Sequence, residues 1–298
     1  MLQLPPDFLK EEVRCGFTVT AQRTRIWAAQ LEMLQLFDEI CRKHNLRYFA
    51  EFGTLLGAVR HQGFIPWDDD LDVAMFRTDY ERMKEILPEE MKEPYFFQNA
   101  YTDSILFAFS KIRDSRTSAI EKKYCDETCP HQGIFIDIFP LDGRWVDDGS
   151  NVEMIEKEIW GTLVNPELME KIVQTPDYPS ALTKDILAAL LQMSPRDRMR
   201  QFEGFLAGQF EGTEKLELIT TAFWGPARRL QKSWYEELVY LPFEHLQIPA
   251  PAGYHQILTQ KYRDYEVFRP GGGGHQGILM DPDKSYTEYY REWGLIKE

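Results

Sequence analysis

One stretch of the chain decides the interpretation of the fold: residues 51–73 read EFGTLLGAVRHQGFIPWDDDLDV. Its last part is the acidic run DDDLD at positions 68–72. Side chains alternate between two faces along a strand, so we expect Asp68, Asp70 and Asp72 to share one face. Carboxylates crowded in this way raise one another's pKa, and a divalent cation among them would remove that cost.

A further carboxylate lies in residues 133–140, GIFIDIFP, where Asp137 is the single charge in an apolar run. Such a run is typical of a strand buried on both faces, and a carboxylate there must be paired, hydrogen-bonded or metal-bound. If this strand lies beside the acidic one, Asp70, Asp72 and Asp137 converge. Hard oxygen ligands suit Mg²⁺ or Mn²⁺, and the three carboxylates could then support a phosphoryl displacement.

A plainer interpretation is that the acidic run is a solvated loop and that Asp137 caps a helix, because acidic runs are usually solvated. The pair Gly53-Thr54 upstream of the run favours the catalytic interpretation. A Gly-Ser or Gly-Thr turn, two carboxylates one residue apart and a third in an apolar strand together resemble the nucleotidyltransferase superfamily. The resemblance implies catalysis by Asp70, Asp72 and Asp137, with Asp68 as an additional metal ligand.

A closer resemblance covers residues 48–75, which look like the hallmark block of the LicD family. This family comprises phosphocholine transferases of bacterial cell-surface glycans, such as teichoic acid and lipopolysaccharide, and is related to the fukutin-type ribitol-phosphate transferases. Residues 111–114 and 131–143 also resemble the family, and 262–265 with the downstream His275 is a weaker match. The pair Glu51-Phe52 departs from the pattern, since relatives more often have a small residue there.

The resemblance implies a Mg²⁺- or Mn²⁺-dependent phosphotransferase with a CDP-alcohol donor, CDP-choline being the leading candidate. The acceptor would be a sugar hydroxyl of a cell-surface glycan or its lipid-linked precursor. The donor phosphates would lie against Gly53, Thr54, Arg60, Lys111 and Arg113. For the basic residues, the plainer alternative is a surface ion pair with an acidic neighbour.

Two other functions remain open from the residues. A true nucleotidyltransferase would move a nucleotide from an NTP to a small hydroxyl acceptor and would use the same metal site. A non-catalytic binding member of the fold would be indicated by loss of a key carboxylate, but Asp70, Asp72 and Asp137 are all present. We therefore expect an enzyme.

Composition narrows the partners and the location. The 298 residues include 34 basic and 48 acidic side chains, a formal net charge of −14, which would repel nucleic acid. Four cysteines are too few for a disulfide framework, and we see neither a signal-like N-terminus nor a membrane span. We expect a cytoplasmic protein without a transmembrane segment, in peripheral contact with the inner face of the membrane where the acceptor is lipid-linked.

The pattern of apolar residues predicts an α+β (mixed α/β) fold, a nucleotidyltransferase-like mixed sheet with flanking helices and a helical insertion. We predict a catalytic core over 1–148, a mostly helical region over 149–240 and a segment over 241–298 that returns to the core. The predicted helices are 20–44, 78–87 with a capping box at its start, 254–264 and 284–293. The predicted strands are 47–52, 71–76, 95–98, 105–112 and 133–139, and loops dominate from Leu241 onward.

Three further features have open roles. Cys125, Cys129 and His131 are ligand types for a structural Zn²⁺, but their spacing is not that of a standard zinc site, which favours two reduced loop cysteines. His275 follows the glycine run 271–274, so it either closes over substrate or is merely exposed. A choline head group would want an aromatic cage, for which the candidates are Trp67, Trp224, Trp234 and Tyr265.

Overall fold

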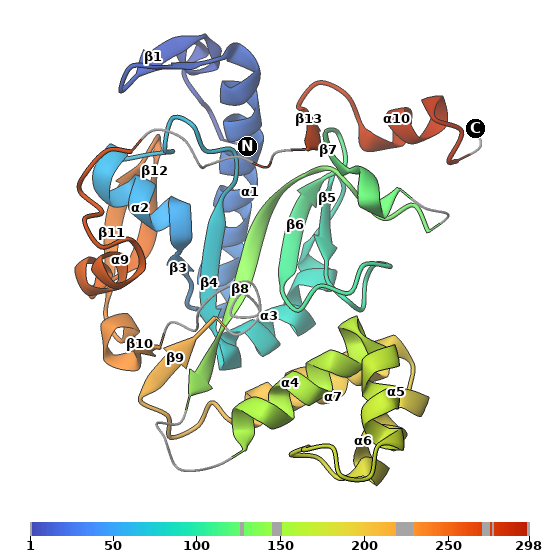
Figure 1. Cartoon of the computed structure of the whole chain (residues 1–298). Coiled ribbons are helices and arrows are strands. Elements are labelled where there is room, and N and C mark those ends of the chain that lie inside the picture. Colours follow the sequence, from blue (N-terminus) through green and yellow to red (C-terminus); the bar gives the residue numbers. More distant parts are fainter. Residues whose placement is uncertain are drawn as a thin grey trace.

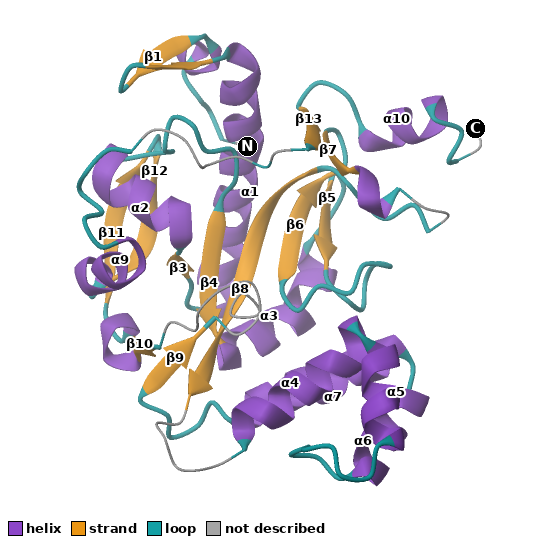
Figure 2. Cartoon of the chain, viewed as in Figure 1, coloured by secondary structure: helices purple, strands orange, loops and turns teal. Residues whose placement is uncertain are grey.

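The computed structural model describes residues 2–125, 128–144, 151–218, 229–269, 275 and 277–296. Figures 1 and 2 show a central sheet with the long helix α1 (Ala21–His44) lying across one face and a group of helices at one end. This arrangement confirms the predicted mixed α/β class. Within the described ranges, no helix combines the length and apolar character that crossing a bilayer requires.

The central sheet has seven strands in the order β10-β9-β8-β4-β3, with β6 also paired to β8 and β5 paired to β6. The long strand β8 pairs in parallel with β4 along one edge and antiparallel with β6 along the other, and its last residues pair antiparallel with β9. The strands are β3 Phe49–Ala50, β4 Asp72–Phe76, β5 Tyr95–Gln98, β6 Ser110–Asp114, β8 Ile134–Arg144, β9 Lys215–Glu217 and β10 Leu230–Gln231.

The register of the central strands places charged side chains side by side. Asp72 at the start of β4 lies opposite Asp137 of β8, and Lys111 of β6 lies opposite Asp137 on the other edge. Every residue of β8 is buried, as the apolar run predicts for a strand covered on both faces. The sheet itself therefore brings the two predicted acidic strands together.

Helix α1 confirms the predicted helix over 20–44. The Thr20 side chain accepts the Arg23 N–H at its start, and Asn45 in the left-handed conformation ends it. Its apolar stripe packs on the sheet, and Trp27, Leu31 and Phe37 are fully buried. The other helices around the sheet are α2 Phe52–His61, α3 Arg77–Glu90, α9 Tyr254–Tyr262 and α10 Tyr286–Glu292, with short 3-10 turns η1 Pro6–Leu9, η2 Lys122–Tyr124 and η3 Lys232–Tyr235.

The predicted strand over 47–52 is wrong at its end. Only Phe49–Ala50 pairs in the sheet, and α2 begins at Phe52, because the Glu51 carboxylate accepts the Phe52 N–H and starts a helix. Gly53 therefore lies in the first turn of a helix and does not stop a strand. The strand predicted over 105–112 also shifts, to Ser110–Asp114, where pairing with both β5 and β8 is available.

The boundaries predicted for the second helix are wrong as well. Helix α3 begins at Arg77 with Phe76 as its N-cap residue, and no side chain caps it, so the expected capping box is absent. The helix also runs past Pro88 to Glu90. A proline in the last turn removes a single helical hydrogen bond and leaves the preceding turns intact.

A second group of helices has its own small cores. It comprises α4 Val152–Val164, α5 Pro166–Gln174, α6 Lys184–Gln192 and α7 Pro195–Gly208. Ile159, Met199, Phe202 and Leu206 form one core with side chains of the sheet-side loop, and Leu187 centres a smaller one. The Ser194 side chain caps α7, with Pro195 at its first position, as predicted.

In the described residues the α-helices of this region lie between Val152 and Gly208, and the chain then returns to the sheet through β9 and β10. Residues 219–228 lie outside the described residues, so the extent of the predicted helical region up to 240 stays a prediction. Loops were predicted from Leu241, but β11 Leu238–Phe243 and β12 Leu246–Pro251 form a hairpin. A two-stranded hairpin leaves one edge of each strand unpaired, and prolines are tolerated on such edges. The remaining strands are β1 Glu12–Arg14 with β2 Phe17–Val19, and β7 Ser118–Glu121 with β13 Ile278–Asp281.

Candidate active site

Helix α1 fixes the backbone of the acidic loop that leads into β4. Arg23 and Trp27 donate hydrogen bonds from Nη1 and Nε1 to the Asp68 carbonyl oxygen, at 2.6 and 3.1 Å. The buried amide of Gln30 donates to the Asp69 carbonyl at 2.8 Å. Because these carbonyls are held from one side, the positions of the successive carboxylates on the other side are set by the helix and not by a free loop.

The pair Gly53-Thr54 packs directly on the acidic residues. The Thr54 hydroxyl oxygen accepts the backbone N–H of Asp72 at 2.8 Å, so this buried side chain holds the start of β4. A Cβ atom at Gly53 would come within 2.4 Å of Asp68 Oδ2. Glycine is therefore required for close approach, here to a carboxylate. Of the two residues, Gly53 lines the cavity described next.

The helix that carries this pair is anchored by a buried acid. Glu51 pairs with Lys261 of α9 and accepts a hydrogen bond from the Tyr235 hydroxyl at 2.9 Å. All three side chains are buried. Glu51, which departs from the family pattern, is thus the point where the C-terminal part of the chain is joined to α2.

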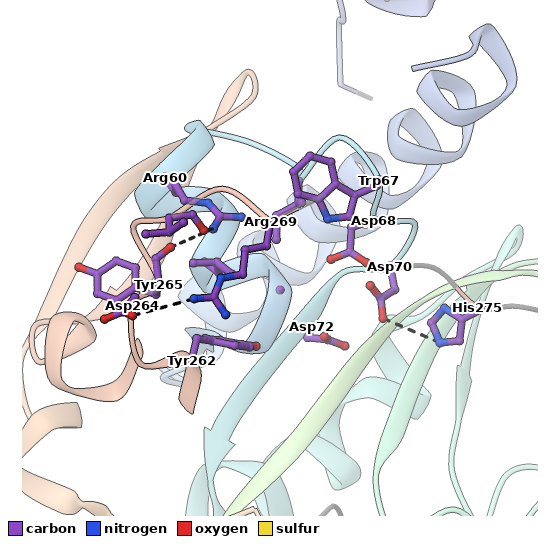
Figure 3. A pocket seen from close by; sticks show the side chains of 14 residues that line it. Arg60, Trp67, Asp68, Asp70, Asp72, Tyr262, Asp264, Tyr265, Arg269 and His275 are labelled. Atoms are coloured by element: carbon purple, nitrogen blue, oxygen red, sulfur yellow. Dashed lines mark hydrogen bonds and ion pairs between the residues drawn. The ribbon is translucent and has the colours of Figure 1, made fainter. Parts of the chain in front are cut away.

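A cavity of about 500 Å³ opens above the acidic loop (Figure 3). Asp68, Asp70 and Asp72 all line it, so the structure places alternate members of the run on one face. The opposite wall carries Arg60, Arg269, Tyr262 and Tyr265, whereas Trp67 lies beside Asp68 (Figure 3). We refer to this space as the arginine cavity.

The two arginines are held from the C-terminal segment. Arg60 Nη1 donates to the carbonyl oxygens of Tyr265 and Val267 at 2.9 and 3.2 Å, and its guanidinium lies over the Phe268 ring. Arg269 lies 3.9 Å from Asp264 and is largely exposed. Two guanidiniums facing a row of carboxylates across a cavity create a place for an anion that also touches a cation bound on the acidic side.

A second cavity, of about 510 Å³, adjoins the first at Asp70, Asp72 and His275, which line both. Asp137 and Lys111 line this second space, so Asp70, Asp72 and Asp137 meet there as predicted from the two motifs. Its remaining wall is rich in aromatic rings: Phe52, Phe107, Phe109, Tyr124, Phe139 and Trp160. We refer to it as the aromatic cavity.

The two basic residues of β6 have different positions. Lys111 Nζ lies 2.5 Å from Asp137 Oδ1 and 3.6 Å from the centre of the Phe135 ring, and burial lowers the pKa of Lys111 even though Asp137 opposes the shift. Arg113 donates to Gln98 and to the Gly133 carbonyl at 2.5 and 2.8 Å and lines neither cavity. Burial lowers the pKa of Arg113 to about 10. Lys111 is therefore placed to meet a substrate, whereas Arg113 braces the sheet.

The positive charge around Asp68, Asp70 and Asp72 does not offset the effects of burial and of their carboxylate neighbours on their pKa values. Burial and the neighbouring Asp68 raise the pKa of Asp70 well above its usual range. Burial, Asp70 and Asp137 do the same to Asp72, and burial raises the pKa of Asp68. Clustered hard oxygen donors with raised pKa values fit a divalent cation such as Mg²⁺ or Mn²⁺, which would stabilise their ionised forms.

His275 and Asp69 form a contact that the motifs did not reveal. The Asp69 carboxylate accepts the His275 backbone N–H at 3.1 Å and lies 3.0 Å from its ring Nδ1. Nε2 of the same ring is 3.8 Å from Asp70 Oδ2. These hydrogen bonds lower the pKa of Asp69 despite its burial, and the bond to Asp69 raises the pKa of His275.

Among the described residues, Asp69, Asp70 and His275 are the three potential ligands that lie close enough together to share one ion. Asp69 lines neither cavity, but its carboxylate lies close enough to that of Asp70 for the His275 ring to contact both. The weak family match at His275 did not indicate Asp69 as its partner, which lies more than two hundred positions earlier in the sequence. The glycine run 271–274 lies outside the described residues.

The candidates for a choline cage separate into groups. Trp67 and Tyr265 line the arginine cavity, and Trp234 packs against Gly253 and lines neither cavity. Trp224 lies outside the described residues. The larger set of rings is in the aromatic cavity, and none of those rings was among the candidates.

The three residues considered as zinc ligands contact other partners. His131 is buried, its Nε2 lies 3.0 Å from the Ser115 hydroxyl, and its ring stacks on Phe96. Cys125 Sγ lies 3.6 Å from Gln132 Nε2, and Cys129 Sγ lies 3.7 Å from the Leu295 carbonyl. In the described part of the chain these three residues do not gather as a ligand group, and the interpretation as two reduced loop cysteines stays a prediction.

A mixed sheet with carboxylates on adjacent central strands, together with a Gly-Thr helix start packed on them, defines a nucleotidyltransferase-like transferase. Residues 45–163 match the family model described as LicD/FKTN/FKRP, nucleotidyltransferase domain. Through residues 45–163 the chain carries a nucleotidyltransferase domain of the LicD/FKTN/FKRP type, which places it in the transferase class.

Curated relatives support this assignment. The chain is 29% identical over 248 residues to the lipopolysaccharide cholinephosphotransferase LicD of Haemophilus influenzae, which covers 80% of this chain and 89% of that protein. It is 46% identical over 72 residues to an uncharacterized protein of Rickettsia prowazekii, covering 24% of this chain and 27% of that one. An uncharacterized protein of Rickettsia typhi is 40% identical over 87 residues, covering 27% and 28% of the two chains.

Proposed function

We propose that the protein transfers a substituted phosphate, phosphocholine in the leading case, from a CDP-alcohol to a sugar hydroxyl of a cell-surface glycan or its lipid-linked precursor. The observation that carries the proposal is the junction of two cavities at Asp70 and Asp72. A phosphate held at these carboxylates would have a separate cavity on each side for the groups attached to it. The resemblance to a cholinephosphotransferase over most of its length supports the same reaction class.

The arginine cavity suits the nucleotide half of the donor. Arg60 and Arg269 would face the pyrophosphate, and aromatic side chains such as Tyr262 and Trp67 offer surfaces for a base. Gly53 lets the Asp68 carboxylate lie against the start of α2, and both residues line the cavity that the donor phosphates would enter. Thr54 would act through its hydrogen bond to Asp72 and not through direct contact with phosphate.

Asp70 and Asp72 would hold the divalent cation as a pair of carboxylate ligands, with the donor phosphate oxygens completing its coordination. Asp68 and Asp137 flank this pair but do not form a three-ligand group with it among the described residues. When bound, Mg²⁺ or Mn²⁺ would neutralise charge that develops on the transferred phosphate and its leaving group. The acceptor oxygen forms a bond to phosphorus, the bond from phosphorus to the CMP oxygen breaks, and CMP departs. The acceptor proton would pass to Asp137, whose carboxylate Lys111 holds in place at 2.5 Å.

The test is CMP release from CDP-choline with Mg²⁺ and a panel of sugar acceptors. We expect Asp70→Asn and Asp72→Asn to reduce turnover by about 100-fold or more, since each removes charge stabilisation from the transition state. Asp177→Asn, a change at an exposed aspartate in the helical segment, is the matched control and should retain full turnover.

Each outcome has a distinct meaning. Turnover of another CDP-alcohol but not CDP-choline would keep the reaction class and change the substrate. Consumption of an NTP with no CDP-alcohol turnover would replace this proposal with nucleotide transfer. Equal activity of the wild type and both asparagine variants would remove Asp70 and Asp72 from the catalytic site.

A further inference from the structure

We propose that the aromatic cavity binds a cationic, methylated ammonium group carried by the transferred phosphate, and that Trp160 from the helical segment forms part of its wall. This inference rests on the proposed function and assigns a place and a chemical class to the substituent. It also gives the helical segment a direct part in substrate selection.

The position of the cavity follows from the shared carboxylates. Asp70 and Asp72 line both cavities, so a phosphate held beside them lies at the junction. If the nucleotide occupies the arginine cavity, the substituent on the other side of that phosphate extends into the aromatic cavity. The nucleotide and the substituent of the donor would then contact the walls of two different cavities.

The wall is built from rings that lie close together but come from distant parts of the chain. The ring centroid of Phe107 lies 5.0 Å from that of Phe109 and 5.9 Å from that of Tyr124. Tyr124 belongs to η2, and Trp160 belongs to α4, where its ring packs on Phe202 at 5.1 Å. Clustered ring faces attract cations through their quadrupoles.

Cations already lie on these rings. Lys111 Nζ is 5.4 and 5.2 Å from the centres of the Phe107 and Phe109 rings, and Lys123 Nζ is 4.6 Å from that of Tyr124. Each ammonium has a carboxylate partner, Asp137 for Lys111 and Glu121 for Lys123 at 2.9 Å. Each lining lysine is thus balanced by a carboxylate, so the wall does not favour an anionic substituent over a cationic one.

The same wall disfavours a polyol. Leu106, Phe107, Ala108, Phe109 and Val164 line the cavity with side chains that cannot form hydrogen bonds. A ribitol or glycerol substituent would place hydroxyl groups against them, and each buried hydroxyl without a partner costs about 1–3 kcal/mol. A trimethylammonium group needs no such partner, so its burial carries no comparable penalty.

The test measures binding of phosphocholine and of glycerol 3-phosphate by isothermal titration calorimetry with the full chain and Mg²⁺. We expect phosphocholine to bind at least about 10-fold more tightly, and Trp160→Ala to remove most of that preference, as loss of a cation–π contact and its burial would. Trp160→Phe keeps a ring and should keep most of the preference. Trp293→Ala, on the distant α10 end, is the matched control.

Tyr124→Leu provides a second variant, because Tyr124 lies on a partly exposed 3-10 turn and its replacement should leave the fold intact. Equal wild-type affinity for the two phosphates, or equal weakening of both by Trp160→Ala and Tyr124→Leu, would overturn the inference. Selective binding of phosphocholine without CMP release from CDP-choline would keep this site and reject the proposed function. CMP release from CDP-choline and CDP-glycerol alike, without selective binding, would reject this site and keep the proposed function.

Discussion

The contact between Gly53 and Asp68 shows how one atom determines the shape of the site. An added Cβ would come 2.4 Å from Asp68 Oδ2, so Gly53→Ala must displace that carboxylate. We expect turnover to fall by about 10- to 100-fold because a displaced group near the reacting atoms loses its alignment. Steady-state CMP release measures this, and the thermal midpoint should change little. Gly204→Ala, where a Cβ meets open space, is the control.

Thr54 supports β4 through a single buried hydrogen bond. In Thr54→Val the shape is kept, but the Asp72 N–H loses the hydroxyl oxygen that accepts it at 2.8 Å. We expect the free energy of unfolding to fall by about 1–3 kcal/mol, the usual cost of an unsatisfied buried donor. Urea denaturation measures it, and Thr54→Ser should recover most of the loss. An unchanged midpoint in the valine variant would contradict this role.

At the scale of residues, the carboxylates that meet in the site could be predicted from the sequence, but the contacts that hold Asp69 and Arg113 in place could not. Asp70, Asp72 and Asp137 could be predicted to meet because strand alternation and an isolated charge in an apolar run are local signals. The contact of Asp69 with His275 depends on a segment far along the chain, where no local signal exists. Arg113 shares a face with Lys111, as predicted, but its depth in the sheet depends on Gln98 of the neighbouring strand.

Among the elements, α2 and α9 are joined by a buried ion pair, that between Glu51 and Lys261. Lys261→Met leaves Glu51 buried without its cation, which typically costs about 3–5 kcal/mol. We therefore expect a marked fall in the midpoint of chemical denaturation. The double variant with Glu51→Gln should be more stable than the single one because no uncompensated charge remains. Lys10→Met, at a largely exposed position, serves as control and should have little effect.

The elements that could be predicted are those with a strong internal pattern. Helix α1 has a stripe of apolar residues, a threonine cap and a clear end, so its sequence is sufficient. The start of α2 could not be predicted, because Phe49–Ala50 reads as a strand and the turn into the helix depends on the capping role of Glu51. The β11–β12 hairpin was missed because Pro249 and Pro251 indicate loops unless the strand's free edge is known.

On the scale of the whole molecule, stability should depend on pH and on metal together. The folded protein raises the pKa of Asp70 and Asp72 above the ordinary value of 3.8, so without metal it binds more protons than the unfolded chain. Stability from these groups is present at low pH and is lost as the pH rises from about 4 through their folded values. The thermal midpoint of the metal-free protein should therefore fall over this range.

Mg²⁺ should reverse the loss, since it binds the ionised carboxylates of the folded state. We expect the midpoint to rise more on adding Mg²⁺ at about pH 8 than at about pH 5. Asp72→Asn should be more stable than the wild type without metal and should respond less to Mg²⁺, while Asp177→Asn should behave like the wild type. Differential scanning fluorimetry measures all three, and a Mg²⁺ effect independent of pH would contradict a carboxylate site.

The aromatic cavity is lined by Asp72 and Asp137 of the central strands and by Trp160 and Val164 of α4, a helix outside the sheet. If the proposed site is correct, residues for the reaction and residues for substrate choice lie in different stretches of the chain. Changes between 151 and 208 can accumulate, or be engineered, without touching the aspartates. Substitutions in the α4 wall of the aromatic cavity could then change which donor is bound. The reaction at the aspartates would stay the same.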